Sequence, residues 1–190
     1  VLAPGDRVIV TPPVYPPFYD CVEEAGGVAL RVPLIDADGS WVLDLDRIER
    51  ALADGARAVL LCNPHNPTGT VHGRAALVRL AEIAAAHGAV VVSDEIHAPL
   101  VPPGIAFTPF LTASPRAAEV GYTVTSASKA YNLAGLKCAV MVTASAQTAA
   151  VVNALQTGHI QFADVALPLL WNLAAVALGL ALAVLLRWLA

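Results

Sequence analysis

Lys129 and Lys137 are the only two lysines in this chain of 190 residues, and both follow a run with strand character. That run covers residues 121–125, and two hydroxyl side chains, Ser126 and Ser128, separate it from Lys129. A lysine that serves only solubility has no reason to lie at the end of an apolar strand. A desolvated amine loses its proton more easily and becomes a nucleophile that can form a Schiff base with an aldehyde. We therefore expect Lys129 to be a desolvated nucleophile.

Three earlier strand ends carry further side chains with functional potential. Each follows a short run typical of a strand: Tyr15 after residues 7–10, Asn66 after residues 58–62 and Asp94 after residues 89–93. Residues 74–87 have the apolar spacing of a helix that ends at Gly88, so strand, helix and strand form a unit with parallel strands. Ligands of parallel sheets bind beyond the carboxyl ends of the strands. We expect Asp94, Asn66 and the Ser126–Lys129 segment to meet at that edge.

The chemistry that needs a lysine, a carboxylate, phosphate-binding donors and an aromatic platform together is pyridoxal phosphate catalysis. Lys129 would hold the cofactor aldehyde as an imine and later move the α-proton of the substrate. Asp94 would face the pyridine nitrogen and keep it protonated. The remaining roles are phosphate binding for Ser126, Ser128 and Lys137, hydrogen bonding to the ring hydroxyl for Asn66 and His97, and ring stacking for Tyr15.

Each of these residues also has a simpler explanation. Tyr15 could be a loop aromatic that packs on the core, and Asn66 could cap its own loop. Asp94 and His97 could be part of a metal site, but no second pair of ligands supports one. Ser126 and Lys129 have the Ser-x-x-Lys spacing of serine acylases, with Ser126 as nucleophile and Lys129 as base. The Ser-Asp-Asn and Lys-Thr-Gly tripeptides that accompany that motif do not occur in this sequence.

Four motifs, in this order, resemble the large domain of fold-type I enzymes of the aminotransferase class I/II superfamily. They are residues 11–18 (TPPVYPPF), 63–69 (NPHNPTG), 93–97 (SDEIH) and 125–137 (TSASKAYNLAGLK). Within the superfamily the chain most resembles the cystathionine β-lyase (cysteine-S-conjugate β-lyase) branch, because His97 stands where most of the aminotransferases carry tyrosine. The resemblance covers about residues 1–143. It implies pyridoxal 5'-phosphate as cofactor, an amino acid as substrate and a homodimer in the full-length parent.

The resemblance implies an α/β fold, a three-layer α/β/α large domain with a mainly parallel sheet that is incomplete at both ends. We expect residues 1–145 to form part of the domain that binds the cofactor. Residues 146–190 are expected to form an apolar helical tail, which we interpret as the truncated link toward a small domain. Residues 36–39 are expected to form a turn, and residues 99–115 a proline-rich loop without a clear period.

Composition and charge indicate which partners are not expected and in which compartment the protein is expected. The net charge is -4 and no stripe of lysine and arginine is present, so nucleic acid is not an expected partner. Three widely spaced cysteines in apolar surroundings (Cys21, Cys62 and Cys138) are expected to be buried free thiols in a reducing compartment. Since no secretory signal is visible, we expect a cytoplasmic protein. Residues 165–186 carry no charge and are long enough to span a bilayer, but Pro168 and Asn172 interrupt them and the upstream chain has a soluble character, which favours a core segment.

The predicted activity is β-elimination from a sulfur amino acid such as cystathionine, giving a thiol, ammonia and pyruvate. Transamination on the same residues is the first alternative. A non-catalytic module that binds the cofactor, or a regulatory relic of the enzyme, is the second. A membrane-attached variant is the third, and it rests only on residues 165–186.

Overall fold

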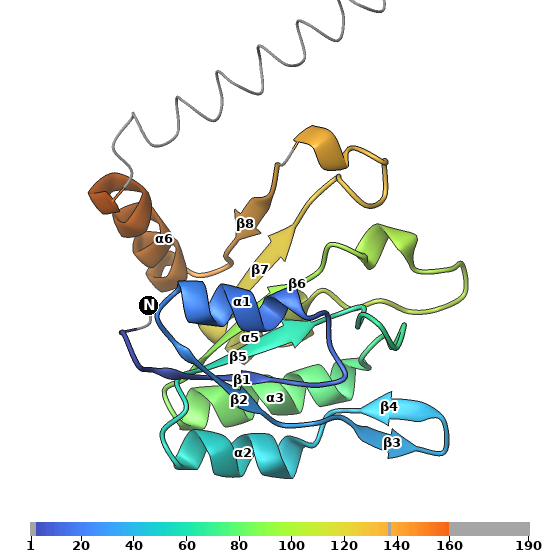
Figure 1. The fold of residues 1–190 in the computed structure, drawn as a ribbon, viewed down its shortest axis with the longest axis horizontal. Helices are drawn as coiled ribbons and strands as arrows, with labels where there is room; N and C mark the ends of the chain where they lie inside the picture. Colours follow the sequence, from blue (N-terminus) through green and yellow to red (C-terminus); the bar gives the residue numbers. More distant parts are fainter. Residues whose placement is uncertain (1–2, 137, 160–190) are drawn as a thin grey trace, which may run out of the picture. The chain divides into compact units, whose positions relative to one another are not determined.

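The structure is a computed structural model that describes residues 3–136 and 138–159 (Figure 1). By its internal contacts the chain forms two compact units, Val1–Ala149 and Ala150–Ala190. The first unit contains a six-stranded sheet in the order β2-β1-β5-β6-β7-β8 and a separate hairpin, β3-β4. The strands are β1 (Arg7–Val10), β2 (Val28–Arg31), β3 (Ile35–Ala37), β4 (Ser40–Val42), β5 (Ala58–Cys62), β6 (Val90–Asp94), β7 (Gly121–Thr125) and β8 (Val140–Val142).

Helices cover both faces of this sheet. They are α1 (Pro17–Glu24), α2 (Leu45–Ala53), α3 (Arg74–Ala86), α4 (Phe110–Ala113) and α5 (Pro115–Val120), with short 3-10 turns η1 (Ala98–Leu100) and η2 (Ala134–Leu136). A last helix, α6 (Ala146–His159), begins in the first unit and continues into the second. The α1 face has a small core around Val10, Phe18 and Val22. The opposite face has a larger core to which α2, α3, α4 and α5 contribute. This is the α/β fold, helices on both sides of a mainly parallel sheet, that the sequence predicts.

Local sequence explains the parallel strands and the helix ends. Ala58, Val59, Leu61 and Cys62 of β5 are all buried, as expected for a central strand covered on both faces. Asp44 caps α2, because its carboxylate accepts a hydrogen bond from the Arg47 N–H over 3.0 Å. Strands β1, β2, β5, β6 and β7 run parallel, and β8 pairs with β7 in the antiparallel direction.

Two segments contain more regular structure than we expected. The turn predicted over residues 36–39 is confirmed for Asp38 and Gly39, whereas Asp36 and Ala37 belong to β3. This turn joins β3 to β4, two strands that were not predicted. Asp38 and Gly39 both have positive φ, 52° and 84°, as a two-residue hairpin turn requires. The expectation of an irregular loop over residues 99–115 is wrong at its end, because α4 places the fully buried Phe110 in the larger core.

The cysteines and the apolar tail are only partly as predicted. Cys62 is buried, but Cys21 and Cys138 are exposed, so burial was wrongly predicted for two of the three; all three are free thiols. Cys21 faces outward from the amphipathic helix α1. No helix among the described residues is long and apolar enough to cross a membrane. Residues 165–186 lie outside the described residues.

Candidate active site

The carboxyl ends of β1, β5, β6 and β7 lead into the segments that carry the predicted site residues (Figure 1). These four strands are parallel, and β5, β6 and β7 are direct neighbours. In the sheet register Asp94 lies between Cys62 on one side and Val124 on the other. The ladder continues past the strand ends, because the Asn63 N–H donates to the Asp94 carbonyl over 2.9 Å. The fold therefore fixes Asp94 between the Asn66 loop and the Ser126 turn.

Asp94 is a partly buried carboxylate with one oxygen already engaged. Its Oδ1 accepts a hydrogen bond from the Ile96 N–H over 3.0 Å. Burial raises the pKa of this carboxyl, while the Ile96 N–H and the charge of nearby His97 act in the opposite direction. No hydrogen bond from a described residue reaches Oδ2. The second oxygen is thus available to a cationic group such as a protonated ring nitrogen.

The thiol of Cys62 forms two hydrogen bonds with the loop after β5. The Asn66 N–H donates to Cys62 Sγ over 3.3 Å, and Sγ lies 3.4 Å from the Pro64 carbonyl, to which it donates. Burial raises the pKa of this thiol to about 11, with the Asn66 N–H lowering it and Asp94 raising it further. The thiol therefore keeps its proton and its donor role. The side-chain amide of Asn66 has no hydrogen-bond partner among the described residues and can donate to a ligand.

Two contacts join this loop to the segment that carries Tyr15. The Tyr15 N–H donates to the Asn66 carbonyl over 3.0 Å. The Nε2 of His65, a fully buried ring, lies 2.9 Å from the Pro13 carbonyl, so this nitrogen carries the proton of a neutral imidazole. Tyr15 itself is 46% exposed, which leaves its ring available for stacking. The predicted packing of Tyr15 on the core is therefore limited to part of its surface.

A second histidine supports His65 within the protein. The rings of His65 and His72 meet edge to face, with 5.6 Å between centroids. The main-chain N–H of His72 donates to the side-chain oxygen of Asn63 over 3.0 Å. Burial lowers the pKa of His65. It also lowers the pKa of His72 to about 4, and the neighbouring His65 ring acts in the same direction because two adjacent imidazoles resist carrying charge together. Both rings are therefore neutral at physiological pH and serve the loop as structural groups.

The segment after β7 is a hydroxyl-lined turn. Ser126 Oγ accepts from the Ser128 N–H over 3.1 Å and lies 2.8 Å from the Ser128 hydroxyl. It also donates to the Cys138 carbonyl over 2.6 Å, which ties the turn to the segment leading into β8. Two adjacent hydroxyls at a strand end match the expected phosphate donors. Lys137 lies outside the described residues.

Lys129 departs from the expectation in one respect. The sequence analysis predicted a desolvated amine, and this prediction is wrong for the described chain, in which Lys129 is exposed. The reason is its position: Lys129 lies beyond the last paired residue of β7, in a turn closed by the Tyr131 N–H and the Ala127 carbonyl at 3.0 Å. No hydrogen bond or ion pair links it to the other site residues described.

His97 and Asn66 both line a pocket of about 430 Å³. The rest of its wall comes from the Asn66 loop and from the segment after His97, and it includes Val71, Leu100 and Val101. Among the residues that the structure describes, no lysine, arginine or carboxylate lines it. Tyr15, Asp94, Ser126 and Lys129 are not part of its wall, so the pocket adjoins the predicted cofactor site without containing it. No group of three or more metal-ligating residues occurs among the described residues.

Glu95 has a structural role that the sequence analysis did not assign. It is 5% exposed, and its Oε1 accepts from the Phe110 N–H at 2.7 Å and from the Ser93 hydroxyl at 3.0 Å. Burial raises the pKa of this carboxyl against the effect of these donors. Glu95 thus fastens α4 beside the site. Cys62 and His65 were also missed as fastening groups, and their contacts depend on a folded loop that no local pattern reveals.

Comparison with known proteins agrees with the geometry of this site. Residues 1–169 match the family model described as aminotransferase class I and II. Cystathionine beta-lyase PatB of Bacillus subtilis (strain 168) is 42% identical over 140 residues, which cover 73% of this chain and 36% of that protein. A Thermus aquaticus protein named Probable aspartate/prephenate aminotransferase is 38% identical over 135 residues, which cover 71% of this chain and 34% of that protein.

A solved structure gives the same result. The crystal structure of cystalysin from Treponema denticola, which contains a pyridoxal 5'-phosphate cofactor, matches with a TM-score of 0.71 and 30% identity. The match covers 76% of this chain and 37% of that one. The chain spans about a third of the length of the curated relatives it matches.

Proposed function

Because the chain belongs to the aminotransferase class I and II family, we propose that it carries the cofactor-binding part of a pyridoxal 5'-phosphate enzyme. The proposed activity is β-elimination from a sulfur amino acid, giving a thiol, ammonia and pyruvate. The substrate class is cystathionine or another cysteine S-conjugate. The observation that carries the proposal is the position of Asp94 at the carboxyl end of β6, between the Asn66 loop and the Ser126 turn.

The donors present fit the cofactor. Asp94 has a raised pKa and an unengaged oxygen, and pairing with a protonated pyridine nitrogen would favour its ionised form. The amide of Asn66 and the ring of His97 face a common space from two loops and would donate to the ring hydroxyl. Ser126, Ser128 and Lys137 would bind the phosphate, and the exposed ring of Tyr15 would stack on the cofactor.

Each residue then has a defined chemical task. When bound, the cofactor provides a ring that stores the electron pair left on the α-carbon of the substrate. Lys129 would anchor the cofactor and take the α-proton on its Nζ. Asp94 would keep the ring nitrogen protonated, which favours that electron storage. Departure of the thiolate from the β-carbon, followed by addition of water, completes the conversion to pyruvate and ammonia.

The relatives favour elimination over transamination, because the protein named cystathionine beta-lyase PatB is 42% identical over 140 residues and the one named Probable aspartate/prephenate aminotransferase is 38% identical over 135. His97 supports the same branch, as its sequence context predicts. Transamination remains the second candidate, supported by the similarity to the Thermus aquaticus protein. A non-catalytic relic that binds the cofactor is the third.

The proposal extends to the organisation of the protein. We assign residues 1–145 to the cofactor domain and residues 146–190 to an apolar tail that links toward a small domain. The partner is a second copy of the full-length parent, and the compartment is the cytoplasm. Nucleic acid and membrane are not proposed partners.

A binding experiment with the full chain tests the cofactor assignment. Pyridoxal phosphate should produce a visible absorption band, and borohydride reduction should fix the cofactor to the protein. Because the chain has only two lysines, peptide mass spectrometry separates Lys129 from Lys137 directly. We expect the label on Lys129 and no band in Lys129→Ala. A label on Lys137 alone, or a band that survives Lys129→Ala, would refute the assignment.

Product analysis tests the reaction. Pyruvate release from cystathionine without an added 2-oxo acid supports the lyase. Amino transfer that requires the 2-oxo acid supports the aminotransferase. A labelled Lys129 with neither product identifies a binding relic.

A further inference from the structure

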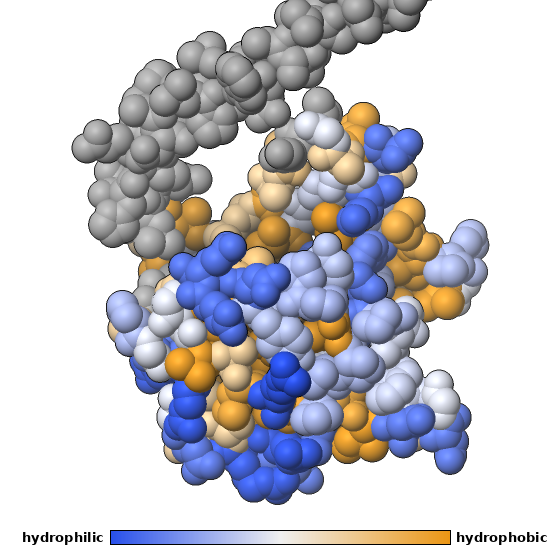
Figure 2. All heavy atoms as spheres, viewed as in Figure 1, coloured by the Kyte–Doolittle hydropathy of each residue, from blue (hydrophilic) through white to orange (hydrophobic). Residues whose placement is uncertain are grey.

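A pocket lined by arginines lies away from the candidate active site, between α2 and the edge of the sheet. Its volume is about 280 Å³, and its wall includes Arg7, Arg31, Arg47, Arg50 and Asp54. Arg7 begins β1, Arg31 ends the edge strand β2, and the other three lie on α2 or at its end. Figure 2 shows strongly hydrophilic side chains gathered over α2. Four arginine residues therefore line one small space in a chain whose net charge is -4.

None of these four arginines forms an ion pair within the described residues. Arg79 pairs with Glu49 and Glu82, and Arg116 pairs with Glu119, so other surface arginines of the described chain do find carboxylates. The Asp54 carboxylate also lines the pocket but lies beyond 4 Å from each guanidinium. One carboxylate against the guanidinium groups of Arg7, Arg47 and Arg50 leaves an excess of positive charge. Like charges held close together raise the free energy of the fold unless an anion lies between them.

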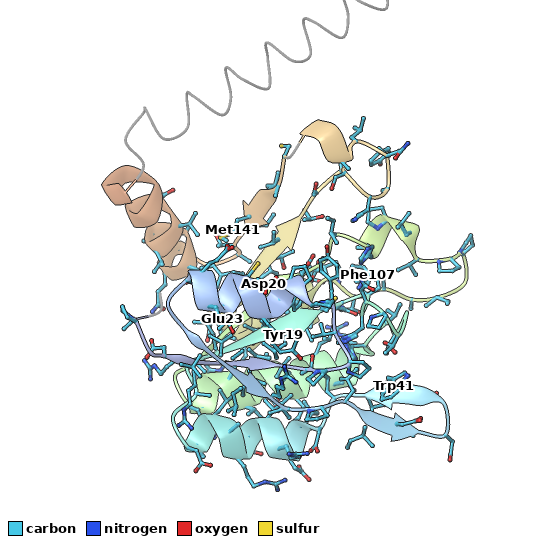
Figure 3. All side chains as sticks on the ribbon, viewed as in Figure 1. Tyr19, Asp20, Glu23, Trp41, Phe107 and Met141 are labelled. Carbon is cyan, nitrogen blue, oxygen red and sulfur yellow. The ribbon has the colours of Figure 1, made fainter. Side chains whose placement is uncertain are left out.

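Two of the arginines are held in place by contacts other than ion pairs. Arg7 is half-buried and donates from Nη2 to the Asp54 carbonyl at the end of α2. The guanidinium of Arg31 lies 4.6 Å from the ring centre of Tyr19 on α1, the side chain labelled in Figure 3. Both contacts leave most of the five N–H donors of each guanidinium unused. Arg47 and Arg50, one turn apart on α2, are exposed and can move toward a ligand.

We propose that this pocket binds a small multivalent oxyanion of the phosphate type. Guanidinium groups bind phosphate oxygens through paired N–H donors, and several of them are needed to neutralise a polyvalent anion. The volume suits a small molecule, and the short stretch of positive charge does not suit a nucleic-acid backbone. The site is separate from the Ser126 turn, because the pocket lies at the β2 edge of the sheet while that turn follows β7.

A calorimetric titration of the full chain with inorganic pyrophosphate tests this proposal. The Ser126→Ala/Ser128→Ala/Lys137→Ala background removes all three candidate phosphate donors of the cofactor site, so that pyrophosphate binding there is suppressed. In that background we expect one pyrophosphate site, and Arg47→Gln/Arg50→Gln should weaken it at least tenfold. Arg79→Gln/Arg116→Gln is the matched control, which removes two arginines from the surface elsewhere and should leave the affinity unchanged.

Two outcomes would overturn the proposal. One is heat no larger than that from sodium chloride of equal ionic strength. The other is equal affinity in the Arg47→Gln/Arg50→Gln protein and the control. Because both substituted side chains are exposed, folding of the variants is verified by circular dichroism. Arg7→Gln, on β1, provides a second test from a different element.

Discussion

The main-chain N–H of Tyr15 donates to the main-chain carbonyl of Asn66 over 3.0 Å, and this bond joins two of the predicted cofactor residues directly. The two are 51 positions apart in the chain and follow the neighbouring strands β1 and β5. Beside this bond, His65 Nε2 reaches the Pro13 carbonyl over 2.9 Å. The ring of Tyr15 and the amide of Asn66 are therefore carried by two loops that are bonded to each other. A substitution that displaces one loop is expected to displace the other.

The His65 bond to Pro13 gives the first prediction. His65→Leu removes the hydrogen bond from the fully buried imidazole to the Pro13 carbonyl, and we expect the free energy of unfolding to fall by about 1 kcal/mol. Affinity for pyridoxal phosphate should fall about tenfold because Tyr15 and Asn66 lose their common support. Equilibrium titration followed by the visible band measures the affinity. His65→Gln, whose amide can donate to the same carbonyl, should recover part of the loss; equal effects of the two variants would contradict this role.

The thiol of Cys62 gives the second prediction. Cys62→Ala removes both the acceptor for the Asn66 N–H and the donor to Pro64, whereas Cys62→Ser keeps a group able to serve both. We expect cofactor affinity to decrease roughly three- to tenfold in Cys62→Ala, as for the loss of one or two hydrogen bonds, with partial recovery in Cys62→Ser. Cys21→Ala, at an exposed position, is the control. Titration of all three variants with pyridoxal phosphate under one condition compares their cofactor affinities. A lower affinity in Cys62→Ser than in Cys62→Ala would contradict the role of the two Cys62 hydrogen bonds.

Much of the fold could be predicted from runs of apolar residues. Residues 58–62 and 89–92 are continuous apolar runs because their strands are covered on both faces, so their parallel pairing and the carboxyl-end position of Asp94 followed from pattern alone. The strands of the β3-β4 hairpin were missed because each has only three residues and is mostly exposed. The short helix α4 was missed for a similar reason: four residues carry no readable period.

The site residues could be named from the sequence, but their environment could not. The bond of His65 to Pro13 connects residues 52 positions apart, and no local pattern encodes such a contact. The exposure of Lys129 depends on which segments cover the turn after β7, a property of tertiary structure. Glu95 looked like part of a polar motif, and only its contacts with Ser93 and Phe110 identify it as a buried fastening group.

The buried His72 predicts a loss of stability in acid. Its pKa is about 4 in the folded chain against an ordinary value of 6.5, because burial opposes its charge. The unfolded chain therefore binds a proton more readily, so the stabilising contribution is complete above about pH 6.5 and is lost as the pH falls toward 4. The shift corresponds to roughly 3 kcal/mol. Chemical denaturation at a series of pH values should show a smaller decline for His72→Gln than for the original chain.

The carboxylates act with the opposite sign in the same experiment. Asp94 and Glu95 have raised pKa values, so the folded chain binds their protons more tightly and their contribution to stability increases as the pH falls. Both groups are present in the original chain and in His72→Gln, so the difference between the two curves isolates the histidine. His87→Gln, at a partly exposed position at the end of α3, should retain the acid decline. Parallel curves for the original chain and His72→Gln would contradict the prediction.

Gly121 at the start of β7 gives a prediction about the strand that delivers the Ser126 turn. A Cβ at this position would lie 2.4 Å from the Ala117 carbonyl and 2.9 Å from the Phe110 ring, both closer than atoms can approach. The first of these is backbone inside α5 and cannot move without disturbing the helix. We expect Gly121→Ala to cost about 3 kcal/mol, the upper part of the range for overpacked sites. Gly135→Ala, where no atom lies within 4 Å of the new Cβ, should change the free energy of unfolding by less than about 1 kcal/mol. Thermal and denaturant unfolding of both variants measures this difference, and equal stability would mean that α5 does not press on β7 as closely as this contact requires.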